Sequence, residues 1–404
     1  MLRGVRKLPP ATVRVVEADG RSRERVYWEP RYERAAAVPR SADEWRTAVH
    51  EALRTAVARR MVADVPVGVL LSGGVDSSLI VALLAELGQP GLRTFSIGFE
   101  SSQEEAGDEF CWSDRVAAAF GTEHSQIRIP DTELPDAVTG ALAAMNEPLG
   151  SHDTVAFYLL AREVSRHVKV VQSGQGADEV FAGYDWYQQL ARVPREQAAT
   201  AFASAFDDRA HDELAEVLTP EYRCADDVSR AWLAEHIGRP GAETALDAVL
   251  RLDVHGMLPD DPVKRVDSMT MAWGLEARVP FLDQDLVALA AACPPELKLA
   301  QGGKGVLKDA ARRLLPEGVV DRPKGYFPVP GMTTLSGPLL DRVQDALTSP
   351  TAKERGLFEP GCIDALLADP DGRLPRTRGN RLWQIAVLEL WLQEHGIGTT
   401  HGLG

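Results

Sequence analysis

The sequence predicts an α/β protein with a parallel sheet of five-stranded type, helices on both faces of the sheet, and a mainly helical C-terminal part. The first observation is a short apolar run at residues 67–71, which suits a central strand covered on both faces. The second is the alternation of strand and helix patterns up to residue 172, which is typical of parallel sheets with right-handed crossovers. The third is the pattern after Tyr187, where helices follow one another and no convincing strand returns.

The first 40 residues form a lead-in to this sheet. Runs at 12–16 and 25–28 predict two short strands around a turn that contains Gly20. Ser41 and Glu44 then form a capping box, which predicts a helix that runs to about Met61. The other expected strands are 93–99, 124–129 and 169–172, and the other expected helices are 113–120, 154–168, 195–206, 244–252 and 381–394. The chain therefore divides into the lead-in at 1–40, a sheet core at 41–190 and a helical part at 191–404.

Charge and cysteine usage restrict the class of protein. The formal net charge is −15, whereas a protein that holds nucleic acid through phosphate contacts usually has a basic face. The four cysteines have neither C-x-x-C nor zinc-ligand spacing, and we expect four reduced thiols in a cytoplasmic protein. The N-terminus does not read as a signal peptide, and no run approaches 18 apolar residues. We therefore expect no membrane and no nucleic acid among the partners.

A glycine loop follows the strand at 67–71. Residues 72–74 can adopt positive φ and let a ligand approach the backbone, and a helix begins near Ser77. Backbone N–H groups and a helix N-terminus then point to one spot, which suits a phosphate. The loop lacks the lysine of a Walker A sequence and the G-x-G-x-x-G of a Rossmann loop. The alternative is a glycine turn with a capping side chain, but the heptapeptide S-G-G-x-D-S-S at 72–78 favours the phosphate site.

A second glycine loop, at 173–179, follows the strand at 169–172 and ends in Asp178 and Glu179. Two loops that meet at one end of a parallel sheet, each with an aspartate, can hold one Mg²⁺ together with a triphosphate. The alternative is that the two carboxylates only cap a helix. Because Asp76 is expected opposite Asp178, the sequence favours a metal site over helix capping.

Three later runs place charge beside glycine or proline, at 271–283, 302–308 and 322–327. Loops of this kind often carry function, although each run taken singly suits an ion-paired structural site. Together with the two glycine loops, the W-G-L-E-A-R-V-P-F-L-D run at 273–283 and the late Lys324 resemble the synthetase domain of glutamine-dependent asparagine synthetases. The resemblance covers roughly residues 40–395. Residues 260–267, 173–179 and 322–330 also resemble one branch, the N-acetylglutaminylglutamine amidotransferases.

The resemblance implies a fold of the adenine nucleotide alpha hydrolase-like type, in which the first loop, called a PP-loop, binds pyrophosphate. It implies the cofactors ATP and Mg²⁺ and an AMP-forming reaction that adenylates a substrate carboxylate and transfers ammonia to it. The metal ligands would be Asp76 and Asp178. The residues implied to bind ATP are Leu70, Leu71, Ser72, Gly73, Gly74, Asp76, Ser77, Ser78, Ile97, Gly98, Ser173 and Gly174.

The resemblance also supplies candidates for catalysis. Lys324 would steady charge at the reacting centre, and Lys308 is a second candidate for the same region. Gln175 stands where asparagine synthetases have a glutamate. Because an amide cannot act as a base, this replacement argues against aspartate as the acceptor and asparagine as the product. The residues expected to support the pocket are Glu179, Glu276 and Arg278, the last two as a buried pair.

The partners implied are a small carboxylate substrate and ammonia. Glutamine-dependent relatives use a cysteine directly after the initiator methionine as the glutaminase nucleophile, and here that position is Leu2. We expect ammonia to come from elsewhere, with a separate glutaminase domain or subunit as one source, and the lead-in resembles the last stretch of such a domain. The acceptor suggested by the branch is N-acetylglutaminylglutamine. The alternatives are asparagine synthesis from aspartate, or a synthetase subunit or intramolecular amide cyclase without glutaminase activity; a homodimer also stays open.

Overall fold

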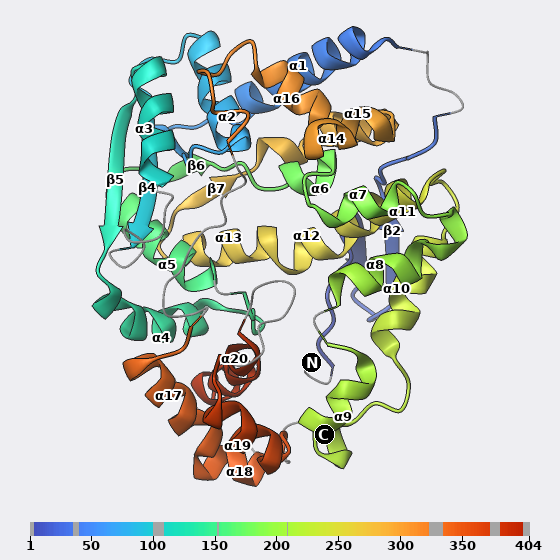
Figure 1. Ribbon diagram of the computed structural model, residues 1–404, viewed down its shortest axis with the longest axis vertical. Helices are drawn as coiled ribbons and strands as arrows, with labels where there is room; N and C mark the ends of the chain where they lie inside the picture. The colour runs from blue at the N-terminus through green and yellow to red at the C-terminus, as the bar shows by residue number, and fades with distance from the viewer. Residues whose placement is uncertain are drawn as a thin grey trace.

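The computed structural model describes residues 4–34, 40–99, 109–151, 153–207, 209–322, 334–371 and 380–398. Its centre is a parallel sheet of five strands in the order β5-β4-β3-β6-β7 (Figure 1). The strands are β3 (Val67–Leu70), β4 (Arg93–Phe99), β5 (Glu123–Ile129), β6 (Val170–Gln172) and β7 (Glu276–Arg278). The central strand β3 pairs in parallel with β4 and with β6, so the predicted α/β class is confirmed.

The two faces of the sheet are buried in two separate hydrophobic cores. Val69 and Leu71 point into one core, and Leu70 between them points into the other, because successive side chains of a strand alternate between the faces. The helices of the first core are α1 (Ala42–Arg59), α2 (Val75–Glu86), α3 (Glu109–Phe120), α14 (Gln284–Ala292) and α16 (Gly305–Ala311). The helices of the second are α4 (Leu134–Ala144), α5 (Asp153–Val164), α13 (Pro262–Met271), α17 (Gly337–Thr348) and α20 (Arg381–Glu394).

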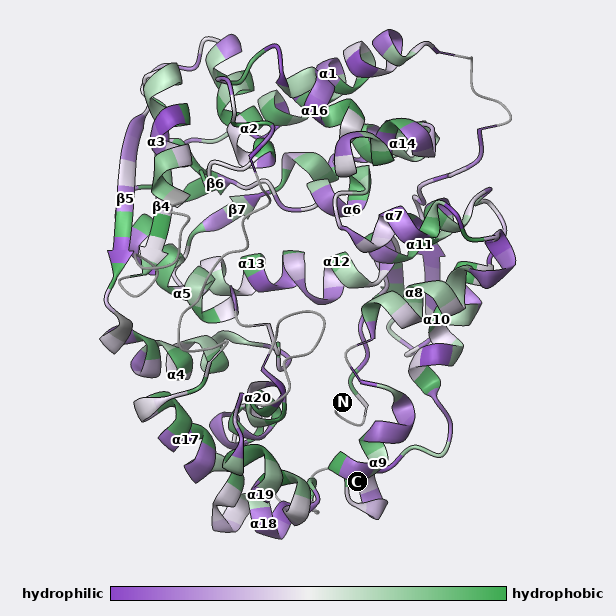
Figure 2. Cartoon of the chain, viewed as in Figure 1, coloured by the Kyte–Doolittle hydropathy of each residue, from purple (hydrophilic) through white to green (hydrophobic). Residues whose placement is uncertain are grey.

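Local sequence explains where the helices nearest the sheet begin. Ser41 accepts a hydrogen bond from the Glu44 backbone while the Glu44 side chain accepts one from Ser41, so the predicted capping box at the start of α1 is present. Helix α2 follows the glycine loop directly and is hydrophobic almost all round (Figure 2). A helix with this composition must be covered on every side, and α1, α3, α16 and β3 cover it.

Strand β7 corrects the expectation that no strand follows Tyr187. It has only three residues, which is too short for an alternating pattern to be read from the sequence. Its backbone pairs in parallel with β6, with Glu276 opposite Val170. The strand exists because a long-range partner supplies its hydrogen bonds.

A third core lies beside the sheet. Its helices are α7 (Trp186–Leu190), α8 (Ala198–Phe206), α10 (Val228–Gly238) and α11 (Ala245–His255), whereas the side chains of α6 (Ala177–Phe181) belong to the first core. The shorter helices of the same half of the chain are α9 (Leu214–Val217), α12 (Met257–Asp260), α15 (Pro295–Leu299), α18 (Pro350–Arg355) and α19 (Pro360–Ala368).

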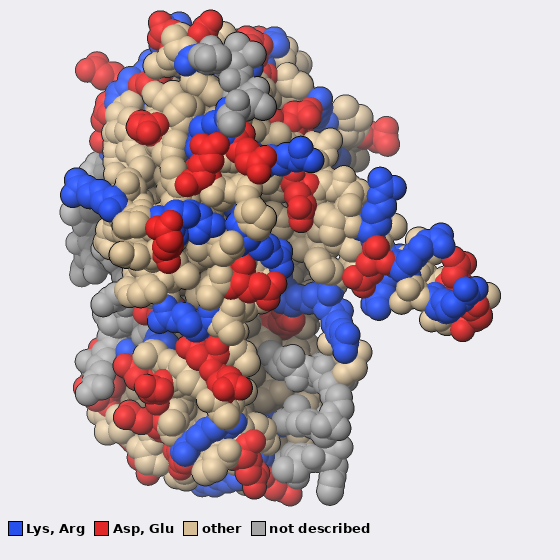
Figure 3. Space-filling model, turned by 90° about the vertical axis from the view of Figure 1, so that its right-hand side faces the viewer, with Lys and Arg blue, Asp and Glu red and all other residues tan. Residues whose placement is uncertain are grey.

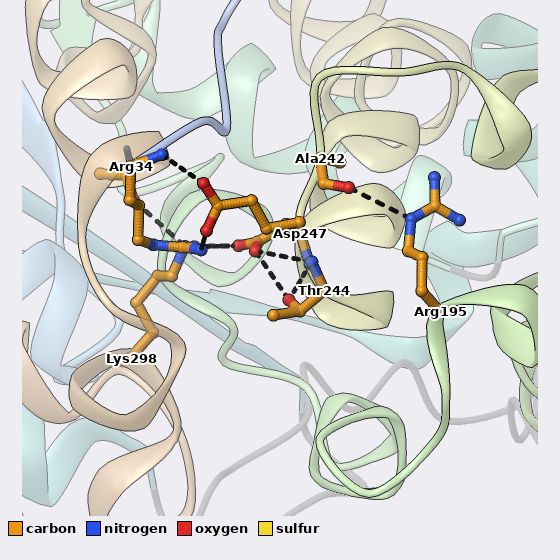
Figure 4. A network of polar contacts seen from close by, with 8 residues as sticks. Arg34, Arg195, Ala242, Thr244, Asp247 and Lys298 are labelled. Atoms are coloured by element: carbon orange, nitrogen blue, oxygen red, sulfur yellow. Dashed lines mark hydrogen bonds and ion pairs between the residues drawn. The ribbon is translucent and has the colours of Figure 1, made fainter. Parts of the chain in front are cut away.

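The end of the lead-in packs against this helical part. Tyr32 is buried in the third core and bridges to Ala242. Arg34 hydrogen-bonds to Asp247, which also lies near the ammonium group of the fully buried Lys298 (Figure 4). The lead-in is therefore joined to the body by a buried ionic cluster.

The start of the lead-in is an antiparallel hairpin of β1 (Thr12–Val16) and β2 (Ser22–Val26). All residues of β2 are exposed, and the hairpin stands out from the body as an arm of mixed charge (Figure 3). On the face shown there, Lys and Arg are interspersed with Asp and Glu. Across the described residues, no helix is both long and apolar enough to cross a membrane.

Candidate active site

A cavity of about 280 Å³ lies at the carboxyl ends of β3, β4 and β6. Ligands of open parallel sheets bind at this edge, and the volume is near the lower end of the usual range for ligand pockets, about 300 Å³. The cavity brings together both predicted loops. The predicted residues that line it are Leu70, Leu71, Ser72, Asp76, Ser77, Ile97, Ser173, Gly174, Gln175 and Asp178.

Part of the cavity lining is apolar. Leu70, Leu71 and Ile97, which were predicted to bind ATP, contribute to it together with Phe95. Helix α5 contributes two further apolar side chains, Phe157 and Leu160, which the sequence reasoning missed. A pocket with apolar walls and a few polar groups suits a flat heterocycle.

The first loop is shaped by two glycines and two serines. Gly73 has φ of +71°, and a Cβ there would lie 2.6 Å from the backbone nitrogen of Ser113, so only glycine fits. Gly74 is the N-cap of α2. The Ser77 hydroxyl lies 3.2 Å from the Ser72 nitrogen and accepts its hydrogen bond. These contacts fold residues 72–77 around the start of α2, where the helix dipole attracts an anion.

Four predicted nucleotide residues lie outside the cavity lining: Gly73, Gly74, Ser78 and Gly98. Ser78 is fully buried in α2, with its side chain inside the protein. Gly98 lies within β4, and a Cβ there would come within 2.6 Å of the Phe110 ring. The missing side chain at Gly98 therefore makes room for this ring.

At the cavity lies an ion cluster whose two aspartates were predicted and whose lysine was not. The Lys304 Nζ lies 2.8 Å from Asp76 Oδ2 and 3.0 Å from Asp178 Oδ1. Burial disfavours the charged lysine, but the charges of Asp178 and Asp76 outweigh burial and raise its pKa above the usual value. Lys304 is only 7 % exposed and adopts φ of +56°. Its position between Gly303 and Gly305 was the available signal.

The two aspartates suit a magnesium ion. Both carboxylates reach one point, which a cationic nitrogen occupies, so the site already accommodates positive charge. A Cβ at Gly183 would lie 1.9 Å from Asp178 Oδ1, so the missing side chain leaves room for this carboxylate. In the described part of the chain no group of three metal-binding side chains occurs. Two carboxylates are nevertheless enough for Mg²⁺, which usually takes its other ligands from phosphates and water.

The other lysine candidates differ in position. Lys308 follows Lys304 by one helical turn, but its Nζ donates to the Gln301 carbonyl at 2.8 Å and it does not line the cavity. Burial and the neighbouring charge of Lys304 lower the pKa of Lys308. Lys324 lies outside the described residues.

Glu179 lies behind the cavity wall. It is 1 % exposed and accepts a hydrogen bond of 2.6 Å from the Tyr184 hydroxyl. Burial, together with the negative charge of Asp178, raises the pKa of Glu179 to about 7. This carboxyl group therefore holds the Tyr184 side chain, which lines the cavity.

The pair formed by Glu276 and Arg278 is not buried, and this corrects the expectation. The Arg278 Nε lies 2.7 Å from Glu276 Oε1, but the Glu276 side chain is 55 % exposed. Arg278 Nη1 donates to the carbonyls of Arg60 and Val62, and its own carbonyl accepts from the Ser173 nitrogen at 2.9 Å. The Arg278 side chain thus ties β7 to the segment after α1, its backbone ties β7 to the second loop, and neither residue lines the cavity.

Five polar residues of the cavity were not predicted. They are Ser96 in β4, Asp153 at the start of α5, Tyr184 after α6, Arg265 in α13 and Arg322. Asp153, Arg265 and Arg322 are distant in sequence from both loops. Arg322 Nη1 lies 3.5 Å from the Ser72 carbonyl oxygen. The cavity lining therefore carries both signs of charge.

The sheet, the loop that precedes α2 and the cavity define an α/β protein with a candidate ligand site at the carboxyl edge of a parallel sheet. The chain belongs to the asparagine synthase family, which matches residues 48–393. It is 30% identical to asparagine synthetase [glutamine-hydrolyzing] 1 of Bacillus subtilis, over 81% of this chain and 56% of that protein. It is also 30% identical to a putative asparagine synthetase of Mycobacterium bovis, over 99% of this chain and 65% of that protein. The chain thus spans between about half and two thirds of the length of these relatives.

Proposed function

We propose that this protein is an ATP-dependent, AMP-forming ligase that adenylates a substrate carboxylate and transfers ammonia to it, forming an amide. The observation that carries the proposal is the meeting of Asp76, Asp178 and Lys304 at a cavity whose lining also includes apolar side chains. ATP fits such a cavity with its base among the apolar side chains and its phosphates at the charged cluster. The names of the relatives, which are asparagine synthetases, support the same reaction class.

The chemistry needs activation because a carboxylate is a poor electrophile. One of its oxygens attacks the α-phosphorus of ATP, the bond to the β-phosphate oxygen breaks, and pyrophosphate leaves with the electron pair. Ammonia then attacks the acyl carbon, and AMP leaves. The protein assists by positioning the groups and by neutralising the negative charge that grows on the departing pyrophosphate.

Specific residues carry these tasks in the proposal. The N–H groups of residues 72–77 and the Lys304 ammonium bind the departing pyrophosphate, and Ser173 and Gly174 meet the ribose or α-phosphate side. Mg²⁺, held by Asp76 and Asp178, would supply positive charge to the phosphates. By family resemblance Lys324 steadies charge at the reacting centre, and Gln175 lines the cavity without serving as a base.

The acceptor we propose is N-acetylglutaminylglutamine, because the runs at 260–267, 173–179 and 322–330 resemble that branch and Gln175 replaces a glutamate. Aspartate, or a carboxylate that reacts with an amine of the same molecule, is the alternative. The ammonia source is free ammonium or a glutaminase domain or subunit, and the proposed location is the cytoplasm.

An ATP–pyrophosphate exchange assay over a panel of carboxylates tests this function. We expect labelled pyrophosphate to enter ATP only when both Mg²⁺ and an accepted carboxylate are present. N-acetylglutaminylglutamine, aspartate and simple monocarboxylates form the panel. Exchange with none of them, or ATP cleavage to ADP and phosphate, would contradict the proposal.

A further inference from the structure

Arg265 is a buried cation in the cavity wall that the proposed adenylation does not use. It belongs to α13, is 7 % exposed and lines the cavity beside Asp153 and Tyr184. Its guanidinium carbon lies 5.7 Å from the centre of the Phe157 ring. The run at 260–267, which contains it, carried a resemblance in the sequence but no assigned task.

Two nitrogens of this guanidinium have different surroundings among the described residues. Nη1 donates to the Ser151 hydroxyl at 2.5 Å and to Asp261 Oδ1 at 3.2 Å. Nε is buried and has no hydrogen-bond partner among the described residues. A buried donor without an acceptor is costly, so an unfilled Nε in a cavity wall calls for a ligand oxygen.

The charge around Arg265 indicates which ligand this is. Asp153 Oδ2 lies 3.9 Å from Nη1 and also lines the cavity. A triphosphate placed here would be repelled by Asp153, whereas Lys304 and the start of α2 offer it favourable contacts elsewhere. An amino-acid or peptide unit carries an N–H group for the carboxylate and a carbonyl-type oxygen for the arginine.

We propose that Arg265, with Asp153, binds an amino-acid or peptide unit of the acceptor, through a carboxylate or amide oxygen other than the carboxylate that reacts. This assignment rests on the proposed function and narrows its substrate class. Arginine suits the task because its fork of donors matches planar oxygen groups and keeps its charge when buried. Arg265 is then a specificity residue that does not touch the nucleotide.

The test compares acceptors and variants by pyrophosphate exchange. The variants are Arg265→Lys and Arg265→Gln, and the acceptors are N-acetylglutaminylglutamine, aspartate and propionate, which lacks the second group. Loss of one charge-assisted hydrogen bond should raise the KM for the accepted amino acid or peptide by about ten- to hundredfold. The KM for ATP should stay unchanged, and so should the weak rate with propionate.

The control is Lys264→Gln, which removes the neighbouring cation of α13. Lys264 pairs with Glu147 and does not line the cavity, so the KM for the acceptor should not change. Asp261→Asn distinguishes a structural role of Arg265 from a role in acceptor binding. It removes the charged partner of Nη1 and leaves Nε unchanged. If Asp261→Asn and Arg265→Lys raise the KM for every acceptor equally, or if the KM for ATP rises instead, the assignment is wrong.

Failure of the proposed function gives a different result. If the wild type catalyses no exchange with any acceptor, the ligase proposal fails, and equilibrium dialysis of labelled N-acetylglutaminylglutamine and aspartate then tests Arg265 alone. Weaker binding by Arg265→Gln than by wild type and Lys264→Gln supports the assignment. Equal binding, or no binding, overturns it. Circular dichroism and thermal unfolding show whether each variant is folded. If Arg265→Gln does not fold, the binding comparison is made with Arg265→Lys.

Discussion

Two buried lysines in this protein have opposite electrostatic surroundings. Lys304 lies within 3.0 Å of two carboxylates at the cavity. Lys298 is fully buried beneath the lead-in, and its Nζ lies 3.7 Å from one carboxylate, that of Asp247, which also binds Arg34 (Figure 4). At Lys304 the carboxylates outweigh burial, and the pKa is raised. At Lys298 burial outweighs the single carboxylate, and the pKa is lowered.

The difference teaches that burial alone does not make an ionic cluster a candidate site. In the Lys298 cluster two cations share one fully buried carboxylate, that of Asp247, while Glu243 contacts Arg34 at the exposed rim. None of these residues lines the cavity, and the cluster joins the lead-in to α11 and α15. The Lys304 cluster has the opposite balance, two carboxylates around one cation, and it lines the cavity through both aspartates. An excess of carboxylate charge beside a cavity suits a divalent cation, whereas a sealed cluster stabilises one arrangement of the chain.

The largest expected effect is on the cavity cluster. Asp76→Asn and Asp178→Asn should each lower exchange by about 10³-fold, because preorganised charge at a reacting phosphate contributes ~10²–10³ or more in rate. The folded structure should persist, since each asparagine keeps the shape of the aspartate. The measurement is exchange at saturating ATP, with thermal unfolding as the control. Wild-type exchange in either variant would remove that residue from the metal site.

The sequence predicted this cluster only in part. Asp76 and Asp178 could be predicted because each follows a strand in a local glycine loop, and parallel strands bring such loops to one edge. Lys304 could not, because it reaches Asp76 from 228 positions away. Arg265, Asp153 and the short strand β7 were missed for the same physical reason: their positions depend on packing between distant segments, and no local periodicity records that.

The sealed cluster should show its effect in stability. Asp247→Asn leaves Arg34 and Lys298 without their shared carboxylate, and an uncompensated buried charge costs about 3 kcal/mol or more of unfolding free energy. Exchange per folded molecule should remain near that of the wild type. Urea unfolding measures the loss. Glu243→Gln is the matched control, because this side chain contacts Arg34 at the exposed rim and should contribute only ~0–1 kcal/mol. Equal losses in both variants would show that burial of Asp247 is unimportant.

A smaller effect depends on pH. The pKa of Glu179 is about 7 in the folded protein and 4.5 in its ordinary state, so between these values the folded state holds the proton and the unfolded state releases it. The unfolding free energy should therefore fall as pH rises, by about 2 kcal/mol from Glu179 between pH 5 and 7. Glu179→Gln should remove this contribution. Urea unfolding at the two pH values, without nucleotide or Mg²⁺, checks it, and an unchanged pH dependence in Glu179→Gln would refute it.

The smallest effect is expected for the lysine one turn beyond the cavity cluster. Lys308 bonds a backbone carbonyl away from the cavity, so Lys308→Ala should change exchange by less than about fivefold, the equivalent of ~1 kcal/mol for an exposed contact. Lys304→Ala should lose far more, because it removes the cation between the two aspartates. Initial exchange rates of the two variants side by side make the comparison, and equal losses would show that the position of Lys304 has no special importance.

The central claim is that a carboxylate oxygen attacks the α-phosphorus of ATP, and oxygen labelling tests it most directly. The acceptor identified by exchange is prepared with ¹⁸O in its carboxylate and incubated with ATP, Mg²⁺ and ammonium. The account predicts one ¹⁸O atom in the phosphate of AMP for each amide formed, and none in pyrophosphate. Label in inorganic phosphate, accompanied by ADP, would show that the carboxylate attacks the γ-phosphorus and would contradict the account.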